Sequence, residues 1–185
     1  MVLFAITALM LTACGNGNDE KNEGSVNDGE SSNESNALEH GVTDQSDVGF
    51  EMAGGKIEEA KDVPKEERQA ILAAFDTYMT AFNEEDLEAY MSVIARNPEG
   101  FEYDQEKTVV EETFAKYEVN RTTEDVTLIK YDENQAQVFA TLHTSMEQKE
   151  TGAKLERSGR QVTVFVNEDG EWRVTSVFYI GDAAE

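Results

Sequence analysis

Apolar and polar residues alternate with a period of two through most of the C-terminal third of the chain. A β-strand with one buried face requires this period, because successive side chains point to opposite faces of the sheet. The alternation predicts strands over residues 135–147, 161–167 and 171–180, and a further strand over about 124–131 precedes them. The apolar residues assigned to the buried face all occupy even positions: Ala136, Val138, Ala140, Leu142, Met146, Val162, Val164, Val166, Trp172, Val174, Phe178 and Ile180.

The connections between these runs are short and carry turn-forming residues. Asp132–Asn134 and Asn167–Gly170 are rich in Asn and Asp, and Thr151-Gly152 marks the remaining connection. Asn, Asp and Gly tolerate the backbone angles that a tight turn needs. Three hairpins in series predict an antiparallel meander.

The odd positions of the same strands carry more apolar side chains than a face in water should. The sequence therefore favours a cover over this face, and we predict a homodimer or a contact with an envelope protein there. Protonation of the histidine in this set is expected to weaken the contact on acidification, because charge would enter a partly dry interface. The alternative is that a bulge reverses the register, so that this histidine faces the cone. The interface candidates are Phe139, His143, Phe165, Val177 and Tyr179.

Before the sheet, apolar residues recur every three or four positions, which predicts amphipathic helices. The first helix begins after Asp62–Pro64, and a second begins at Glu84–Asp86 with Tyr90 on its apolar stripe. A third is capped by Asp104 and runs to about Tyr117. Helices followed by a strand meander predict an α+β fold with the helices on one face of one sheet. The stripe of the first helix is Ile71, Phe75, Tyr78 and Phe82.

This order of elements resembles the NTF2-like superfamily, also called SnoaL-like or ketosteroid-isomerase-like. The resemblance covers about residues 64–179, and it rests on Ile71–Phe82 followed by Asn83–Leu87, and on the closing Asp169–Val174. It implies a cone, in which a curved antiparallel sheet of four or more strands wraps about three N-terminal helices and can leave a pocket at the wide end. Members include isomerases, hydratases, cyclases and transport factors, so the fold alone does not assign a function.

Enzymes of this family use acidic, His or Tyr side chains inside the cone. The even positions over 136–146, 162–166 and 172–180 contain no Asp, Glu or His. The candidates for a ligand pocket are Tyr78 and Tyr90, on the buried helix stripes, and Asp104, near the rim. The favoured hypothesis is a non-catalytic module that binds a small apolar ligand or another protein. The alternative is an isomerase- or hydratase-type enzyme that uses Tyr78 with a rim carboxylate, Glu102 or Asp104.

Neither a cofactor nor a metal is expected from the sequence. No Cys/His cluster, Gly-rich phosphate loop or serine-nucleophile motif occurs in it. The chain carries a formal net charge of −24. Such a surface repels nucleic acid, which we therefore exclude as a partner.

The first residues of the chain predict its location. Met1–Ala13 is apolar, and Leu11–Cys14 resembles the bacterial lipobox, in which the cysteine is lipidated. The apolar run is too short to cross a membrane as a helix, which takes about 20 residues. Cys14 is the only cysteine, so it has no partner for an intramolecular disulfide. We expect residues 1–14 to be a lipoprotein signal, with a lipid on Cys14 anchoring the protein to the outer face of a bacterial membrane.

Residues 15–62 have a different composition, dominated by Asn, Glu, Ser, Asp and Gly. A stretch with so little apolar surface is expected to form a disordered acidic linker. Like charges extend such a chain, which then acts as a stalk between the lipid and the domain. The sequence therefore predicts three parts: the signal, the linker, and an NTF2-like domain over residues 63–185.

Overall fold

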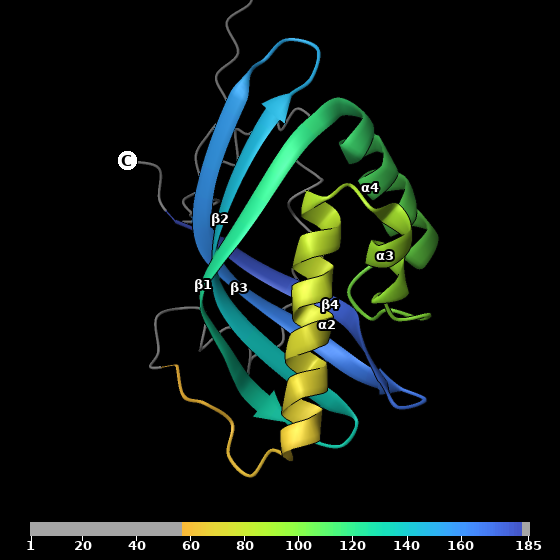
Figure 1. Cartoon of the computed structure of the whole chain (residues 1–185), viewed down its shortest axis with the longest axis vertical. Coiled ribbons are helices and arrows are strands. Elements are labelled where there is room, and N and C mark those ends of the chain that lie inside the picture. The colour runs from red at the N-terminus through yellow and green to blue at the C-terminus, as the bar shows by residue number, and fades with distance from the viewer. Residues whose placement is uncertain (1–56, 183–185) are drawn as a thin grey trace, which may run out of the picture. The chain divides into compact units, whose positions relative to one another are not determined.

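The computed structural model describes residues 57–182, which form helices followed by strands (Figure 1). This arrangement is the α+β fold expected from the sequence. The helices are α2 (Lys65–Asn83), α3 (Leu87–Ser92) and α4 (Tyr103–Lys116). The strands are β1 (Tyr117–Tyr131), β2 (Gln135–Gln148), β3 (Lys154–Glu168) and β4 (Glu171–Gly181).

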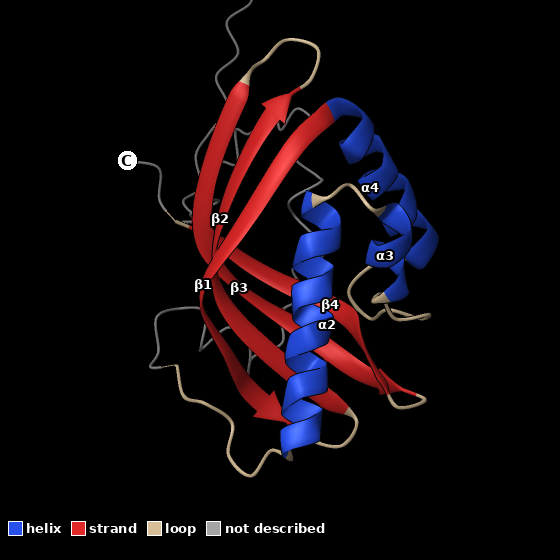
Figure 2. Ribbon diagram, viewed as in Figure 1, coloured by secondary structure: helices blue, strands red, loops and turns tan. Residues whose placement is uncertain are grey.

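The four strands pair in sequence order as one antiparallel sheet, β1-β2-β3-β4. The sheet is strongly curved, and the helices lie on its concave side, with α2 crossing in front of the strands (Figure 2). We call the face toward the helices the inner face and the opposite face the outer face. This arrangement is the cone that the resemblance implies, and the expected α+β fold class is confirmed.

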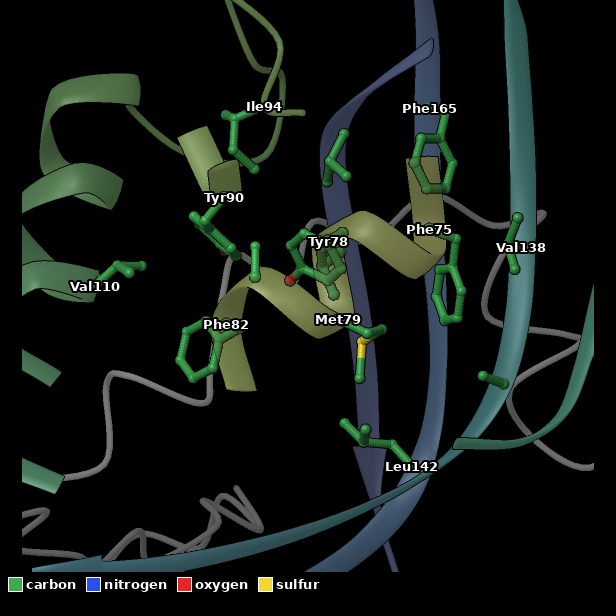
Figure 3. Close-up of a cluster of buried hydrophobic side chains, with 14 of the residues drawn as sticks. Phe75, Tyr78, Met79, Phe82, Tyr90, Ile94, Val110, Val138, Leu142 and Phe165 are labelled. Atoms are coloured by element: carbon green, nitrogen blue, oxygen red, sulfur yellow. The ribbon is translucent and has the colours of Figure 1, made fainter. Parts of the chain in front are cut away.

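The core lies between α2 and the inner face of the sheet. The apolar stripe of α2 is buried, as its spacing predicts, and so are the even positions of β2. In Figure 3, Phe75 projects from α2 toward the strands that carry Val138 and Phe165. These three side chains are each at most 4 % exposed. Burying a side chain of this size stabilises the fold by about 1.5–3 kcal/mol relative to leaving it in water.

The inner face does not follow the even positions in every strand. Val138 of β2 pairs with Thr163 of β3, so the odd residues of β3 share the inner face with the even residues of β2. The prediction for Val162 and Val164 is therefore wrong, because both lie on the outer face. Both faces of β3 carry bulky side chains, so alternation alone did not determine its orientation.

A β-bulge reverses the alternation within β4. Val174 pairs with Phe165 and Ser176 pairs with Val164, which leaves Thr175 as the extra residue. Such an insertion shifts every later side chain to the other face. Val177 and Tyr179 therefore belong to the inner cluster, as does Phe165. Their predicted place on an outer interface is wrong.

The outer face carries its own apolar cluster, to which every strand contributes. Phe139 belongs to this cluster and is only 4 % exposed. Ile57 packs against the cluster from outside the sheet. His143, on the same strand, is exposed and lies 2.8 Å from the Ser158 hydroxyl through Nδ1. The buried members are Ile129, Phe139, Val162, Val164 and Phe178.

Residues assigned to the linker also contact the domain. The backbone N–H of Ala60 donates to the carbonyl of Leu128 in β1 at 2.8 Å, and Arg68 of α2 forms an ion pair with Glu59. The packed part of the chain thus begins before the predicted boundary at residue 62. The predicted lipid site at Cys14 and the linker up to residue 56 lie outside the described residues. Within residues 57–182, no helix is long and apolar enough to cross a membrane.

Candidate functional site

A buried polar cluster occupies the interior next to the apolar core. Its members are Tyr78 from α2, Tyr90 from α3, Glu106 from α4 and Arg121 from β1. All four side chains are at most 6 % exposed. A buried charge is costly unless it is paired or hydrogen-bonded, so the contacts of this cluster decide what it can do.

The strongest contact joins Tyr90 to Glu106. The phenol of Tyr90 donates a hydrogen bond of 2.5 Å to Oε1 of Glu106. Hydrogen bonds of this length between a hydroxyl and a carboxylate are charge-assisted and stronger than neutral ones. Glu106 comes from the same stripe of α4 as Val110 and Phe114, four and eight residues later. The regular helix therefore directs its carboxylate toward the interior.

Both phenols stay neutral over a wide pH range. Burial raises the pKa of Tyr90 well above its usual value, and ionisation of the neighbouring Tyr78 and the charge of Glu106 raise it further. Burial also raises the pKa of Tyr78, although the charge of Arg121 opposes it. The two rings lie 5.2 Å apart between centroids, and Figure 3 shows them on adjacent helices. At neutral pH the cluster thus offers hydroxyl donors.

Arg121 supplies the positive charge of the cluster. Its guanidinium carbon lies 3.5 Å from the centroid of the Phe82 ring, a cation–π contact. The side chain of Asn83 fixes the backbone at this point: it donates to the carbonyl of Arg121 and accepts from its N–H, both at 2.8 Å. The last residue of α2 thereby sets the position of Arg121 along β1.

A small cavity adjoins the cluster at Tyr78 and Arg121. Its volume is about 20 Å³, which is room for about one water molecule. The side chains around this cavity therefore leave little free space in it. The lining residues are Tyr78, Arg121, Leu142, Thr144, Arg157, Gln161, Val177 and Tyr179.

A wider, more open groove lies between α3 and α4. Its volume is about 680 Å³. Leu87, Met91 and Ile94 give it an apolar floor. The arginines at its rim, Arg96 and Arg173, form ion pairs with acidic residues of the β3–β4 turn region. Their charges are therefore already compensated within the domain.

The structure brings together two of the three pocket candidates. Tyr78 and Tyr90 both belong to the buried cluster. Asp104 does not, because it is exposed on the first turn of α4. The helix begins at Tyr103 with Glu102 as its N-cap, so Asp104 is not the cap either. Its role as pocket residue and cap was predicted wrongly, since the helix starts two residues earlier than the sequence suggested.

Sequence reasoning missed Glu106 and Arg121. The signal for Glu106 was its spacing of four from Val110 on an otherwise apolar stripe, which a carboxylate seldom joins unless it is paired. The signal for Arg121 was its place two residues after Val119, but the strand was predicted to start only at about residue 124. Strand β1 in fact starts at Tyr117. Across residues 57–182, no group of three or more His, Cys, Asp or Glu side chains is placed to hold a metal ion.

The comparisons with solved structures agree on the fold. An NTF2-like superfamily protein from Salmonella enterica has a TM-score of 0.56 and 18% identity, with 63% of this chain and 92% of that chain covered. A ketosteroid isomerase-like protein from Erwinia carotovora has a TM-score of 0.53 and 18% identity, covering 65% and 100% of the two chains. Identities this low support a common fold and no more.

The comparison with family models is more specific. No curated protein matches the chain. The model of the C-terminal domain of the anti-sigma-I factor RsgI9 matches residues 73–179, which is more than half of the 185 residues. The match begins within α2 and ends within β4, so it spans the polar cluster completely. The chain therefore belongs to the family of the anti-sigma-I factor RsgI9 C-terminal domain, and it has the NTF2-like fold.

Proposed function

We propose that this protein is a lipid-anchored, extracytoplasmic protein whose NTF2-like domain acts as a non-catalytic ligand-binding or interaction module. The family is named after a domain of an anti-sigma factor, and that name does not describe an enzyme. The lipobox-like Leu11–Cys14 supports the anchor, and the long acidic stretch before residue 57 supports a stalk.

The filled interior carries the non-catalytic part of the proposal. Small-molecule sites usually occupy about 300–1,000 Å³, whereas the cavity beside the polar cluster has about 20 Å³. The buried carboxylate of Glu106 already accepts a hydrogen bond of 2.5 Å from the Tyr90 phenol. A substrate would have to displace this strong hydrogen bond. These contacts favour a role for the cluster in stabilising the domain over a role in catalysis.

The Tyr90–Glu106 pair also supports a second candidate function. A buried carboxylate next to neutral phenols is a reasonable acid–base set for moving a proton beside a carbonyl group. In an isomerase-type reaction, Glu106 would accept the proton and Tyr78 would donate a hydrogen bond to the developing oxyanion. This role requires the small cavity to open enough to admit a substrate.

A steroid β,γ-enone distinguishes the two functions. Isomerisation to the conjugated enone is followed by ultraviolet absorbance, with the wild-type chain and Glu106→Gln at equal concentrations. The module predicts the same background rate for both proteins. Turnover that depends on Glu106 would establish the enzyme instead. A dehydration substrate run in the same way tests the hydratase form of the alternative.

The anchor has its own test, in the full chain. Replacing Cys14 with Ser removes the thiol that would carry the lipid, so we expect the protein to move from the membrane fraction to the medium. The measurement is quantitative immunoblotting of both fractions. A variant that stays in the membrane as fully as the wild type would show that another segment holds it there.

A further inference from the structure

The sheet register sets two arginines beside one threonine on the inner face. Arg121 of β1 pairs with Thr144 of β2, and Thr144 pairs in turn with Arg157 of β3. Neighbouring strands lie about 4.8 Å apart, so the two arginine backbones flank Thr144 at about 10 Å from each other. All three residues line the small cavity. We propose that this cavity is the head-group site for a small ligand that carries a carboxylate, held between Arg121 and Arg157.

An unmet hydrogen-bond donor supports the site. The Nε of Arg121 is buried and has no hydrogen-bond partner in the part of the chain that the structure describes. Buried donors are nearly always satisfied, so a lone one calls for an acceptor from a ligand or solvent. The Asn83 contacts fix the backbone of Arg121, and stacking on the Phe82 ring restrains its guanidinium, which therefore cannot easily turn away to find an acceptor elsewhere. A donor held in place in this way is preorganised for an anion.

The lining of the cavity favours an anion over a cation. Besides the two arginines it contains hydroxyl groups from Tyr78, Thr144 and Tyr179, and none of the lining residues is acidic. This composition stands out in a domain whose charged residues are mostly Asp and Glu. A specific anion site in such a protein needs local positive charge, because the surrounding field repels anions.

Gly159 allows Tyr179 to close one wall of the cavity. A Cβ at this position would lie 2.6 Å from the phenol oxygen of Tyr179 and 2.4 Å from the carbonyl oxygen of Ile180. Any larger residue would therefore push the Tyr179 ring off the sheet. Burial and, next, the charge of Asp182 raise the pKa of the Tyr179 phenol, and the charge of the nearby Arg157 opposes them.

The size of the cavity restricts the ligand. A volume of about 20 Å³ takes only a few atoms, whereas Arg157 and Tyr179 are partly exposed at the entrance. The head group therefore enters, and the rest of the ligand stays outside beside Arg157 and Tyr179, because Leu142 and Val177 are buried. One oxygen of a carboxylate fits this space and can accept from the Arg121 Nε–H, while the second oxygen is left for the partly exposed Arg157. This ligand class rests on the proposed binding function and gives it a chemical identity.

Arg157→Gln is the informative variant, because Arg157 is partly exposed and its replacement should not unfold the domain. The matched control is Arg160→Gln, on the same strand. Arg160 pairs with Thr141, an odd residue of β2, and so lies on the opposite face. Both changes remove one positive charge from a partly exposed arginine. The full chain is titrated with acetate, benzoate and inorganic phosphate at constant ionic strength. The readout is the nuclear magnetic resonance signal of the arginine Nε–H groups.

We expect acetate and benzoate to shift the Arg121 Nε–H signal saturably. Arg157→Gln should weaken this binding by about tenfold or more, since a charged hydrogen bond is lost, and Arg160→Gln should leave it unchanged. No saturable shift, or an equal loss in the two variants, would overturn the site. Tighter binding of phosphate than of both carboxylates would overturn the ligand class. These results are independent of enone turnover, so failure of the site and failure of the non-catalytic function can be told apart.

Discussion

The apolar layer and the polar cluster differ sharply in what holds them together, although α2 contributes side chains to both. Phe75 of α2 packs into an apolar layer with Val138 and Phe165, whereas Tyr78, one turn later, joins the polar cluster. The apolar layer depends on shape and volume alone. The polar cluster depends on each group finding its partner, since a buried donor or acceptor without one is costly. Position on a helix stripe thus indicates that a residue is buried, and the facing elements decide the chemistry around it.

The largest effect is expected in the apolar layer. Phe165 is fully buried, so Phe165→Ala should lower the free energy of unfolding by about 3–5 kcal/mol. The measurement is urea unfolding of the full chain, followed by Trp172 fluorescence. Val126→Ala is the control: Val126 is 41% exposed, and its truncation should change the same free energy by less than about 0.5 kcal/mol. A small effect at Phe165 would argue against its place on the inner face, which follows from its pairing with Ala136 of β2.

In the polar cluster, the loss of stability should depend on whether a substitution leaves a hydrogen-bonding group without its partner. Tyr90→Phe removes the donor to Glu106 and should lower the free energy of unfolding by about 1–3 kcal/mol. Glu106→Leu alone should cost a similar amount. The double variant should cost clearly less than the sum of the two, because neither group is then left without its partner. Additive effects in this double-mutant cycle would show that the hydrogen bond contributes little.

The same cluster predicts a loss of stability in alkali. Burial raises the folded-state pKa of Tyr90 above its unfolded value near 10, and the pKa of Tyr78 is raised too. The folded state therefore keeps protons that the unfolded state releases. Stability is unaffected below pH 10 and falls above it, by up to about 1.4 kcal/mol per pH unit for each such tyrosine.

Thermal unfolding between pH 9 and 11 measures this effect. Tyr90→Phe should give a shallower decline above pH 10 than the wild type, because one of the tyrosines with a raised pKa is gone. Phe165→Ala serves as the control, since it lowers stability without removing a titrating group and should keep the wild-type slope. Equal slopes for wild type and Tyr90→Phe would mean that Tyr90 ionises in the folded state as easily as in the unfolded one.

The sequence predicted the fold better than it predicted the site. Periodicity found the helices and the meander, because burial of one face imposes a period that any composition must obey. It assigned β2 correctly, where small and large apolar residues alternate with polar ones. It placed Phe165 on the wrong face because both faces of β3 are apolar, so even and odd positions look alike. It placed Val177 on the wrong face because the alternation pattern does not reveal the bulge in β4. Arg121 was missed for another reason: its burial depends on Asn83 and Phe82, which are distant in sequence.

The smallest effect is expected at Asp104, two residues before Glu106 on the same helix. Asp104 is exposed in the first turn of α4, where a negative charge interacts favourably with the helix dipole. Asp104→Asn should therefore lower the free energy of unfolding by no more than about 0.3–1 kcal/mol, and added salt should reduce the difference further. Glu106→Gln is the matched change, since it also converts an acid to its amide, but in a buried site with a 2.5 Å contact. It should cost more than Asp104→Asn, and salt should scarcely alter it because water and ions do not reach the group. Urea unfolding of both variants at low and high salt makes the comparison. If the two variants lose equal stability and respond equally to salt, burial does not distinguish the two carboxylates. Asp104 is then again a candidate for the rim carboxylate that the enzyme hypothesis pairs with Tyr78.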